Sequence, residues 1–250
     1  MNLVKTIIQF GLVTLPILVY IPIGFVVFIL SLLGLREPMT HIMYRVAQFW
    51  GLTSIRIVGC KITVSGRENI PREGGVCFVS NHGSIFDILL ALAYIGRPFG
   101  FIAKKELSYV PFLNMWISLL GGFFIDRGNP RKALKTIENG VARIKAGKAM
   151  IIFPEGHRSR GRGLLPFHPG SLKLATRADA IIVPTAISGS YDVFERNYRV
   201  QSVPVSVTFC KPINTADLRG EDKKQVLSDT VYGIIRDALE TSRARAENLT

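Results

Sequence analysis

The chain begins with a long apolar stretch in which no charged side chain occurs between Thr6 and Leu35. A continuous helix of that length would measure about 45 Å, against roughly 30 Å for the hydrocarbon core of a bilayer. Pro16 and Pro22 interrupt the stretch, and Ile21–Gly24 has the composition of a bend. We therefore expect either one kinked, tilted helix that spans a membrane or a helical hairpin that enters one leaflet. A cleaved signal peptide fits less well, because the stretch is too long and lacks a small-x-small cleavage site.

The following segment, His41–Val58, is amphipathic. Arg45 and Arg56 lie on it where they could reach lipid headgroups. The spacing fits a helix in the membrane interface and a helix packed on the rest of the protein equally well. Either arrangement brings the remainder of the chain to a membrane, and basic residues near the ends of the apolar stretch favour the cytoplasmic face, in a bacterium that of the inner membrane. The apolar positions at near-helical spacing are Ile42, Val46, Phe49, Trp50 and Ile57.

From Lys61 onward, short apolar runs alternate with amphipathic segments, which is the pattern of an α/β fold. We expect a mixed, mostly parallel sheet flanked by helices on both faces. The chain then divides into a membrane-associated helical region, 1–58, and an α/β domain, 59–250. The expected strands are 61–65, 76–80, 100–103, 123–126, 149–153, 181–187 and 205–210, and the expected helices are 85–94, 110–120, 131–146, 171–177 and 223–243.

Composition indicates what the domain meets at the membrane. The chain is 48% hydrophobic, its mean hydropathy is +0.29, and its formal net charge is +13. Lys5 is the one charged residue among the first 35, so almost all of the net positive charge belongs to the rest of the chain. An apolar beginning and a basic remainder favour an anionic partner at a membrane. Nucleic acid is excluded as the main partner, because no basic helix with interleaved aromatic residues and no known binding fold occurs.

The cysteines suggest neither a metal site nor a disulfide framework. Cys60, Cys77 and Cys210 are far apart, and no Cys-x-x-Cys pattern occurs. Cys77 lies inside an expected strand, so we expect it to pack as a small buried residue.

The stretch Ser80–Asp87 holds the candidate chemistry. It joins an expected strand to an expected helix, and within it His82 and Asp87 have the residue types of a general base and its orienting carboxylate. Five residues of continuous helix would separate two side chains by roughly 140°, so we expect His82 in the loop and Asp87 on the first helical turn. Ser84-x-x-Asp87 is also a capping-box pattern, which would leave His82 an ordinary loop residue. The spacing alone does not decide between these interpretations.

Four sequence blocks occur in the order found in one enzyme family. They are Asn81-His82-x-x-x-x-Asp87, Gly122-Phe123-Phe124-Ile125-Asp126-Arg127, Phe153-Pro154-Glu155-Gly156-His157-Arg158-Ser159 and Ile182-Val183-Pro184. Together they resemble the motifs of the glycerolipid acyltransferases, over roughly residues 60–215. That family moves a fatty acyl group from a thioester to a hydroxyl of a glycerol phosphate.

The resemblance implies a role for each block. His82 would be the general base, with Asp87 orienting its imidazole. Arg127 would bind phosphate, and Lys104, which matches a basic position between the first two motifs, would do the same. Glu155 and Gly156 would help to form the acceptor pocket, and Val183-Pro184 would line the acyl side. In this chain His157 replaces the small residue that the family usually has, so it is either a second phosphate donor or a tolerated neighbour.

Arginines gather in the third block and directly after it. Arg158, Arg160 and Arg162 follow an expected strand and a Pro-Glu-Gly turn. The planar guanidinium suits phosphate because it can donate two charge-assisted hydrogen bonds at once. By charge alone a solvated basic face is the alternative; the position after a strand favours substrate binding, and Arg158 is the candidate.

The expected chemistry is direct acyl transfer. An alcohol attacks well only when its proton is removed, and histidine does this near neutral pH. Because a thiolate leaves readily, neither an acyl-enzyme, a metal nor another cofactor is required. We expect lysophosphatidic acid as the acceptor, phosphatidic acid as the product, and acyl-carrier-protein or coenzyme A thioesters as donors. The alternatives are glycerol 3-phosphate or another lysophospholipid as acceptor, a thioesterase, and a non-catalytic protein that binds anionic lipid.

Overall fold

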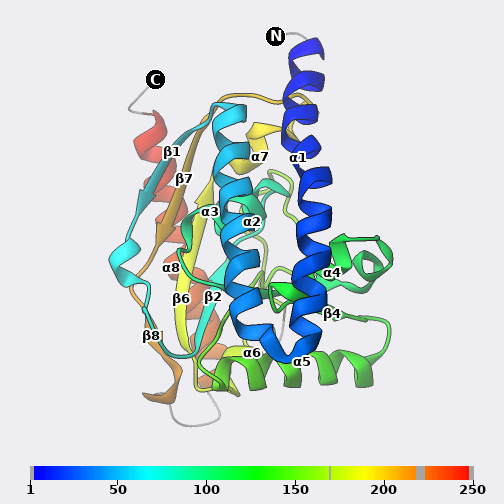
Figure 1. The fold of residues 1–250 in the computed structure, drawn as a ribbon. Coiled ribbons are helices and arrows are strands. Elements are labelled where there is room, and N and C mark those ends of the chain that lie inside the picture. The colour runs from blue at the N-terminus through cyan, green and yellow to red at the C-terminus, as the bar shows by residue number, and fades with distance from the viewer. Residues whose placement is uncertain (1–2, 169, 218–222, 248–250) are drawn as a thin grey trace.

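The computed structural model describes residues 3–168, 170–217 and 223–247, and its centre is one eight-stranded sheet (Figure 1). The strands follow the order β1-β7-β6-β2-β5-β3-β4, with β8 paired to β6. From β6 to β4 the neighbours along this order are parallel, whereas β7 and β8 are antiparallel to β6, and β1 is parallel to β7. The strands are β1 (Lys61–Ser65), β2 (Val76–Ser80), β3 (Phe99–Lys104), β4 (Phe123–Ile125), β5 (Ala149–Ile152), β6 (Ile181–Ser188), β7 (Pro204–Phe209) and β8 (Ile213–Asn214).

Each central strand is buried on both faces, and successive side chains enter two different cores. In β2, Val76 and Phe78 belong to one hydrophobic cluster, while Cys77 and Val79 belong to the other. The first cluster contains residues of the N-terminal helices and α3 (Phe86–Tyr94), and the second contains residues of α8 (Lys223–Glu247). The expected fold, a mostly parallel sheet flanked by helices on both faces, is therefore confirmed.

Shorter helices complete the described part of the domain. They are α4 (Leu113–Leu119), α5 (Pro130–Lys145), α6 (Lys173–Thr176) and α7 (Ser190–Val193). All the expected strands occur, with ends that differ from the prediction by no more than one residue. The sequence pattern missed β8 and α7, because two-residue and four-residue elements are too short to show a period.

The N-terminal region is an antiparallel helical hairpin. Helix α1 (Leu3–Leu30) and helix α2 (Arg36–Val58) are joined by a turn at Ser31–Leu35, and in this turn Gly34 has φ of 91°. The side chain of Gln9 donates to the carbonyl of Ile57 at 3.0 Å, and the indole of Trp50 donates to the carbonyl of Val13 at 2.9 Å. The two helices therefore lie side by side along their length (Figure 1).

The chain does not reverse at the predicted bend, Ile21–Gly24. This segment is helical, and the chain reverses about ten residues later, at Gly34. A proline removes one backbone donor and often kinks a helix without ending it, whereas a reversal needs the left-handed conformation that glycine adopts without steric cost. The apolar stretch is a single helix as far as Leu30, and the hairpin joins it to the predicted amphipathic segment. The choice between a helix that spans the membrane and a segment that enters one leaflet stays a prediction. Among the described residues, the stretch 4–58 is long and apolar enough to cross a membrane by length and composition.

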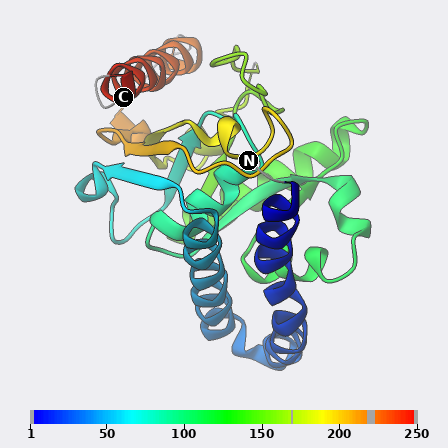
Figure 2. The ribbon, with the colours of Figure 1, turned by 90° about the horizontal axis from the view of Figure 1, so that it is seen from above.

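Helix α2 packs on the domain through a stripe different from the predicted one. Its buried apolar residues lie in the first core, between the sheet and α1, whereas Ile42 and Phe49 are exposed. The segment has two apolar stripes, and the spacing alone favours the one that faces outward. Seen from above, the hairpin stands on one side of the sheet and α8 on the other (Figure 2). The buried stripe comprises Met43, Tyr44, Ala47, Ile55 and Val58.

Candidate active site

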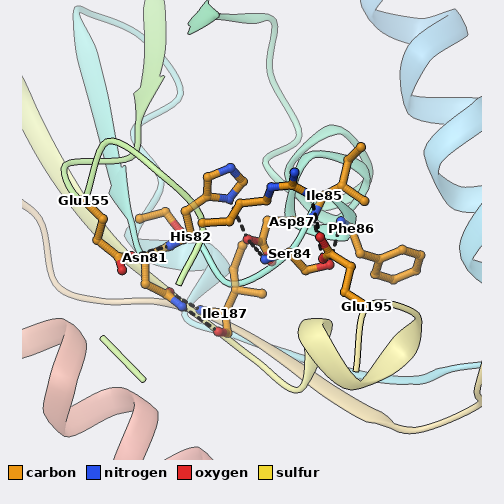
Figure 3. Close-up of polar contacts among 11 residues, drawn as sticks. Asn81, His82, Ser84, Ile85, Phe86, Asp87, Glu155, Ile187 and Glu195 are labelled. Carbon is orange, nitrogen blue, oxygen red and sulfur yellow. Dashed lines mark hydrogen bonds and ion pairs between the residues drawn. The ribbon is translucent and has the colours of Figure 1, made fainter. Parts of the chain in front are cut away.

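The predicted histidine and aspartate meet at the end of β2 (Figure 3). Nδ1 of His82 and Oδ2 of Asp87 are 2.8 Å apart. The aspartate is fully buried, whereas 17% of the histidine side chain is exposed. Because a carboxylate only accepts hydrogen bonds, Nδ1 must donate and Nε2 is left with a lone pair. Among the described residues none is hydrogen-bonded to Nε2, so His82 has the arrangement of a general base.

The contact of Asp87 with His82 occurs together with capping contacts between Asp87 and Ser84. Oδ2 of Asp87 also accepts the backbone N–H of Ser84 at 2.9 Å, and the hydroxyl of Ser84 accepts the N–H of Phe86 at 3.1 Å. These contacts resemble a capping box just before α3, but the hydroxyl accepts from Phe86, one residue earlier than in the usual pattern. The same carboxylate oxygen therefore starts the helix and orients His82. The cap does not compete with the histidine contact, because one oxygen can accept two hydrogen bonds.

The imidazole and the backbone of His82 are held from several sides. The ring of Phe153, the first residue after β5, stacks on it with centroids 4.2 Å apart and an angle of 23° between the planes. The backbone N–H of Ser159 donates to the carbonyl of His82 at 2.7 Å. Residues of the first and third sequence blocks therefore touch, as expected for loops at the carboxyl edge of neighbouring parallel strands.

Asn81 extends the pairing of β2 with β6 by one residue. Its amide nitrogen donates to the carbonyl of Ile187 at 2.9 Å, and its amide oxygen accepts the Ile187 N–H at 2.8 Å. A side-chain amide here imitates a backbone peptide, so the chain can leave the strand at His82 and still be fixed to the sheet (Figure 3). The sequence motif contains Asn81, but nothing in its spacing indicates this role.

Glu155 lies beneath the histidine loop with 1% of its surface exposed. Oε1 accepts the backbone N–H of His82 at 2.6 Å, and Oε2 accepts the backbone N–H of Leu165 at 2.9 Å. Burial raises the pKa of this carboxyl, against a smaller lowering by the two backbone donors. In this structure Glu155 fixes the loop, and a direct part in acceptor binding stays a prediction.

Arg127 reaches the third block from the end of β4. A Cβ atom on Gly156 would lie 3.5 Å from Nη1 of Arg127 and 2.6 Å from Cδ2 of His168. Gly156 also has φ of 72°, so glycine suits this position for conformation and for space. The rings of His157 and His168 are 6.3 Å apart. One arginine and two histidines thus surround the turn, and all three side chains are exposed.

The remaining predicted residues lie at the same edge of the sheet or inside it. Lys104 is exposed at the end of β3, in register with Ile125 of β4. Arg158 is 33% exposed and forms an ion pair with Glu195, an acidic residue that no motif indicated. Val183 is fully buried in β6, so its predicted contact with an acyl chain stays a prediction.

Cys77 is packed in the second core with no exposed surface, and burial raises the pKa of its thiol. A thiol that resists ionisation is a poor nucleophile. In the described part of the chain, no group of three or more His, Cys, Asp and Glu side chains lies close enough together to hold a metal ion.

These features together define a class. An α/β sheet presents one histidine, oriented by a buried carboxylate, at the carboxyl edge of its central strands, with basic side chains at the ends of the strands beside it. This is the layout of an enzyme that activates a hydroxyl or water by general-base catalysis near an anionic group.

Comparisons with known proteins give the family. A family model described as Acyltransferase matches residues 61–188. A 1-acyl-sn-glycerol-3-phosphate acyltransferase of Salmonella typhimurium is 31% identical over 189 residues, 75% of this chain and 73% of that protein. The enzyme of the same name from Borreliella burgdorferi is 29% identical over 75% of both chains, and that of Saccharomyces cerevisiae is 33% identical over 74% of this chain and 61% of its own.

A solved structure extends the likeness to the whole fold. The crystal structure of the 1-acyl-sn-glycerophosphate (LPA) acyltransferase PlsC from Thermotoga maritima has a TM-score of 0.83 at 26% identity, and the match covers 98% of each chain. The chain therefore belongs to the acyltransferase family, and the resemblance predicted from the four sequence blocks is confirmed.

Proposed function

We propose that this enzyme transfers a fatty acyl group from a thioester to the sn-2 hydroxyl of 1-acyl-sn-glycerol 3-phosphate and so forms phosphatidic acid. The His82–Asp87 pair supports this reaction most directly, because Nε2 of His82 has no hydrogen-bond partner among the described residues. The names of the relatives supply the acceptor.

The transfer needs no covalent enzyme intermediate. Nε2 of His82 removes the proton of the acceptor hydroxyl while the oxygen attacks the thioester carbonyl. The tetrahedral intermediate collapses, the carbon–sulfur bond breaks, and the thiolate leaves with an ester as the second product. Asp87 stabilises the imidazolium formed in the first step, and it does so strongly because it is fully buried. The thiolate then takes up the proton, so the enzyme returns to its starting state without a metal or other cofactor.

The anionic substrates meet a basic edge of the sheet. Arg127 lies against Gly156, one residue beyond the carboxylate that fixes the histidine loop, and Lys104 ends the neighbouring strand. We assign the acceptor phosphate to Arg127, with Lys104 and Arg158 as further donors. The donor is a coenzyme A or acyl-carrier-protein thioester, both of which are anionic and suit the net charge of +13.

The exposed apolar surface of the hairpin supports a location of the site at a lipid surface. Along the outer side of α1 and the turn, large apolar side chains are exposed, among them Leu15 at 60% and Leu33 at 72%. A soluble protein rarely leaves such a row uncovered. We therefore propose that α1 lies in the cytoplasmic leaflet, where the acceptor and the product also reside.

The test is thiol release from long-chain acyl-coenzyme A and acyl-carrier-protein by detergent-purified protein, with and without lysophosphatidic acid. We expect release that depends on the acceptor and is lost in His82→Ala.

Arg127→Ala should raise KM for the acceptor at least tenfold and change KM for the donor less than twofold. Arg131→Ala, at an exposed position on α5, is the matched control and should behave as wild type. Release that ignores the acceptor would indicate a thioesterase, and no release from either donor would indicate a lipid-binding protein.

A further inference from the structure

The segment after α7 contains an acidic side chain that joins two parts of the site. Glu195 lies two residues beyond the end of α7, and 11% of its side chain is exposed. Oε1 forms an ion pair with Nη1 of Arg158, and Oε2 accepts the backbone N–H of Ile85 at 3.0 Å (Figure 3). One carboxylate therefore links the loop after β5 to the first turn of α3.

This link completes the support of the turn that presents the base. At its first residue, His82, the turn is fixed by the side chain of Glu155 and by the backbone N–H of Ser159. At its last residue, Ile85, it is fixed by Glu195. Because Arg158 directly precedes Ser159, both ends of the turn are tied to one short segment of the third block.

Charge explains the choice of side chains. Asp87 is already a fully buried carboxylate in the first turn of α3, and Glu195 adds a second negative charge beside it. The helix N-terminus favours anions there, but two carboxylates at one helix end also repel each other. Arg158 offsets that repulsion. With 33% of its side chain exposed, Arg158 still has guanidinium donors accessible to an anionic ligand.

We propose that Glu195 is a positioning residue of the acyl transfer, a role that rests on the proposed function. Through Arg158 it orients a guanidinium for the acceptor phosphate. Through Ile85 it holds the first turn of α3, and with it Asp87, in the geometry that orients His82. The two contacts predict separate kinetic effects, one on acceptor binding and one on the chemical step.

Glu195→Gln and Glu195→Ala separate these effects in the thiol-release assay. The amide oxygen of glutamine can still accept the Ile85 N–H, but the charge that pairs with Arg158 is gone. We expect both variants to raise KM for lysophosphatidic acid at least fivefold and to leave KM for the donor within twofold. We expect kcat to fall at least tenfold in Glu195→Ala and less than threefold in Glu195→Gln. Combined with Arg158→Ala, neither change should raise the acceptor KM further.

Asp192→Asn is the matched control, because Asp192 is an acidic residue of α7 that pairs with Arg196 and, within the described residues, has no hydrogen bond to the turn. It should have wild-type kcat and KM. The inference is wrong if Glu195→Gln and the soluble fraction of Glu195→Ala both keep the wild-type kcat and acceptor KM. Glu195 would then only stabilise the fold, even if the unfolding temperature of the variants is lower. If the wild type itself shows no acceptor-dependent release, the proposed function fails and the inference fails with it.

Discussion

At the scale of single residues, the site depends on three carboxylates, Asp87, Glu155 and Glu195, that accept hydrogen bonds from defined donors. Asp87 uses one oxygen for a helix cap and an imidazole, Glu155 uses two for backbone amides, and Glu195 uses two for a guanidinium and an amide. A buried carboxylate is costly unless its oxygens are hydrogen-bonded. Both oxygens of Glu155 and of Glu195 are paired in this way, whereas Oδ1 of Asp87 is buried without a hydrogen-bond partner among the described residues. The hydrogen bonds that do form fix the backbone around His82.

Glu155→Gln should reduce both activity and stability. Glutamine has one acceptor oxygen, whereas the backbone N–H groups of His82 and Leu165 each need one. One N–H group is therefore left without a partner, which lowers the free energy of unfolding by about 1–3 kcal/mol. We expect kcat to fall at least tenfold and the unfolding temperature in detergent to fall by several degrees. A variant with wild-type kcat would contradict the supporting role of this carboxylate.

The same substitution should alter the pH dependence of stability. Burial raises the pKa of Glu155, so its contribution to stability is fully present below the pKa of the unfolded carboxyl and is lost as the pH rises through the folded-state pKa. The gap in unfolding temperature between wild type and Glu155→Gln should therefore be larger at about pH 5 than at about pH 8. Because all other groups titrate in both proteins, the difference in unfolding temperature between them reports on Glu155 alone. A difference that becomes smaller toward low pH would contradict a raised pKa of Glu155.

At the scale of elements, close approach between helices decides where side chains are allowed. A Cβ on Gly24 of α1 would lie 2.7 Å from the indole nitrogen of Trp116 and 2.9 Å from the methyl of Met115, both on α4. Real contacts of that length do not occur, so the side chains of Trp116 and Met115 would have to shift. The ring of Tyr20 also contacts Trp116, with centroids 6.0 Å apart. Helix α1 thus rests on α4 as well as on α2.

Gly24→Ala and Gly11→Ala make a matched pair on one helix. A Cβ on Gly11 would have no described atom within 4 Å, so alanine there should be neutral or stabilising by up to about 1 kcal/mol through helix propensity. At Gly24 alanine brings the same gain in helix propensity, but overpacking against α4 lowers the stability by about 1–3 kcal/mol. Unfolding in detergent, followed by tryptophan fluorescence, should rank Gly24→Ala below wild type. Equal stability of the two variants would contradict the α1–α4 contact.

Elements also show what the sequence can and cannot predict. The central strands are found to within a residue, because runs such as Val76–Ser80 are apolar on both faces and end at a motif. The sequence marks a bend at Pro22 but does not indicate the reversal at Gly34, because proline is the stronger local signal. It favours the outward stripe of α2 because Met43 and Tyr44 are less conspicuous than Phe49. Each error arises where tertiary packing outweighs a local pattern.

The site shows the same limit. The contact between His82 and Asp87 could be expected from the resemblance of the four sequence blocks, whereas their spacing alone left it open. Glu195 could not, since 110 residues separate it from Ile85 and no motif surrounds it. Neither could the two hydrogen bonds between Asn81 and Ile187, which require the register of β2 against β6.

At the scale of the whole molecule, apolar and basic surfaces lie on different parts of the chain. The exposed apolar residues are concentrated on α1 and the hairpin turn, and the basic residues of the motifs lie at the carboxyl edge of the sheet. Helix α8 covers the other face of the sheet with Leu227, Val231 and Ile235 directed into the second core. The molecule therefore has one side suited to lipid and an opposite side suited to water.

Charged substitutions on the two sides should separate these surfaces. Leu15 on α1 is 60% exposed and Val226 on α8 is 59% exposed, so neither change to glutamate should disturb a core. Leu15→Glu should lower the fraction of protein that sediments with phosphatidylglycerol-containing vesicles at least fivefold, because a charge in the apolar part of a bilayer costs about 2.5–3.5 kcal/mol. Val226→Glu should sediment as wild type does. Equal binding of both variants would rule out α1 as the membrane contact.

The packing of α2 into the first core has a consequence for biosynthesis. Tyr44 contacts Phe99, and the same cluster includes Phe209, near the end of the last long strand. At a synthesis rate of about 5–20 residues per second, the ribosome needs on the order of ten to thirty seconds to pass from the first of these residues to the last. During that interval the inner face of the hairpin lacks part of the core that covers it in the finished protein. We expect the nascent chain to reach the membrane before its catalytic domain has formed, so that the enzyme matures where it will work.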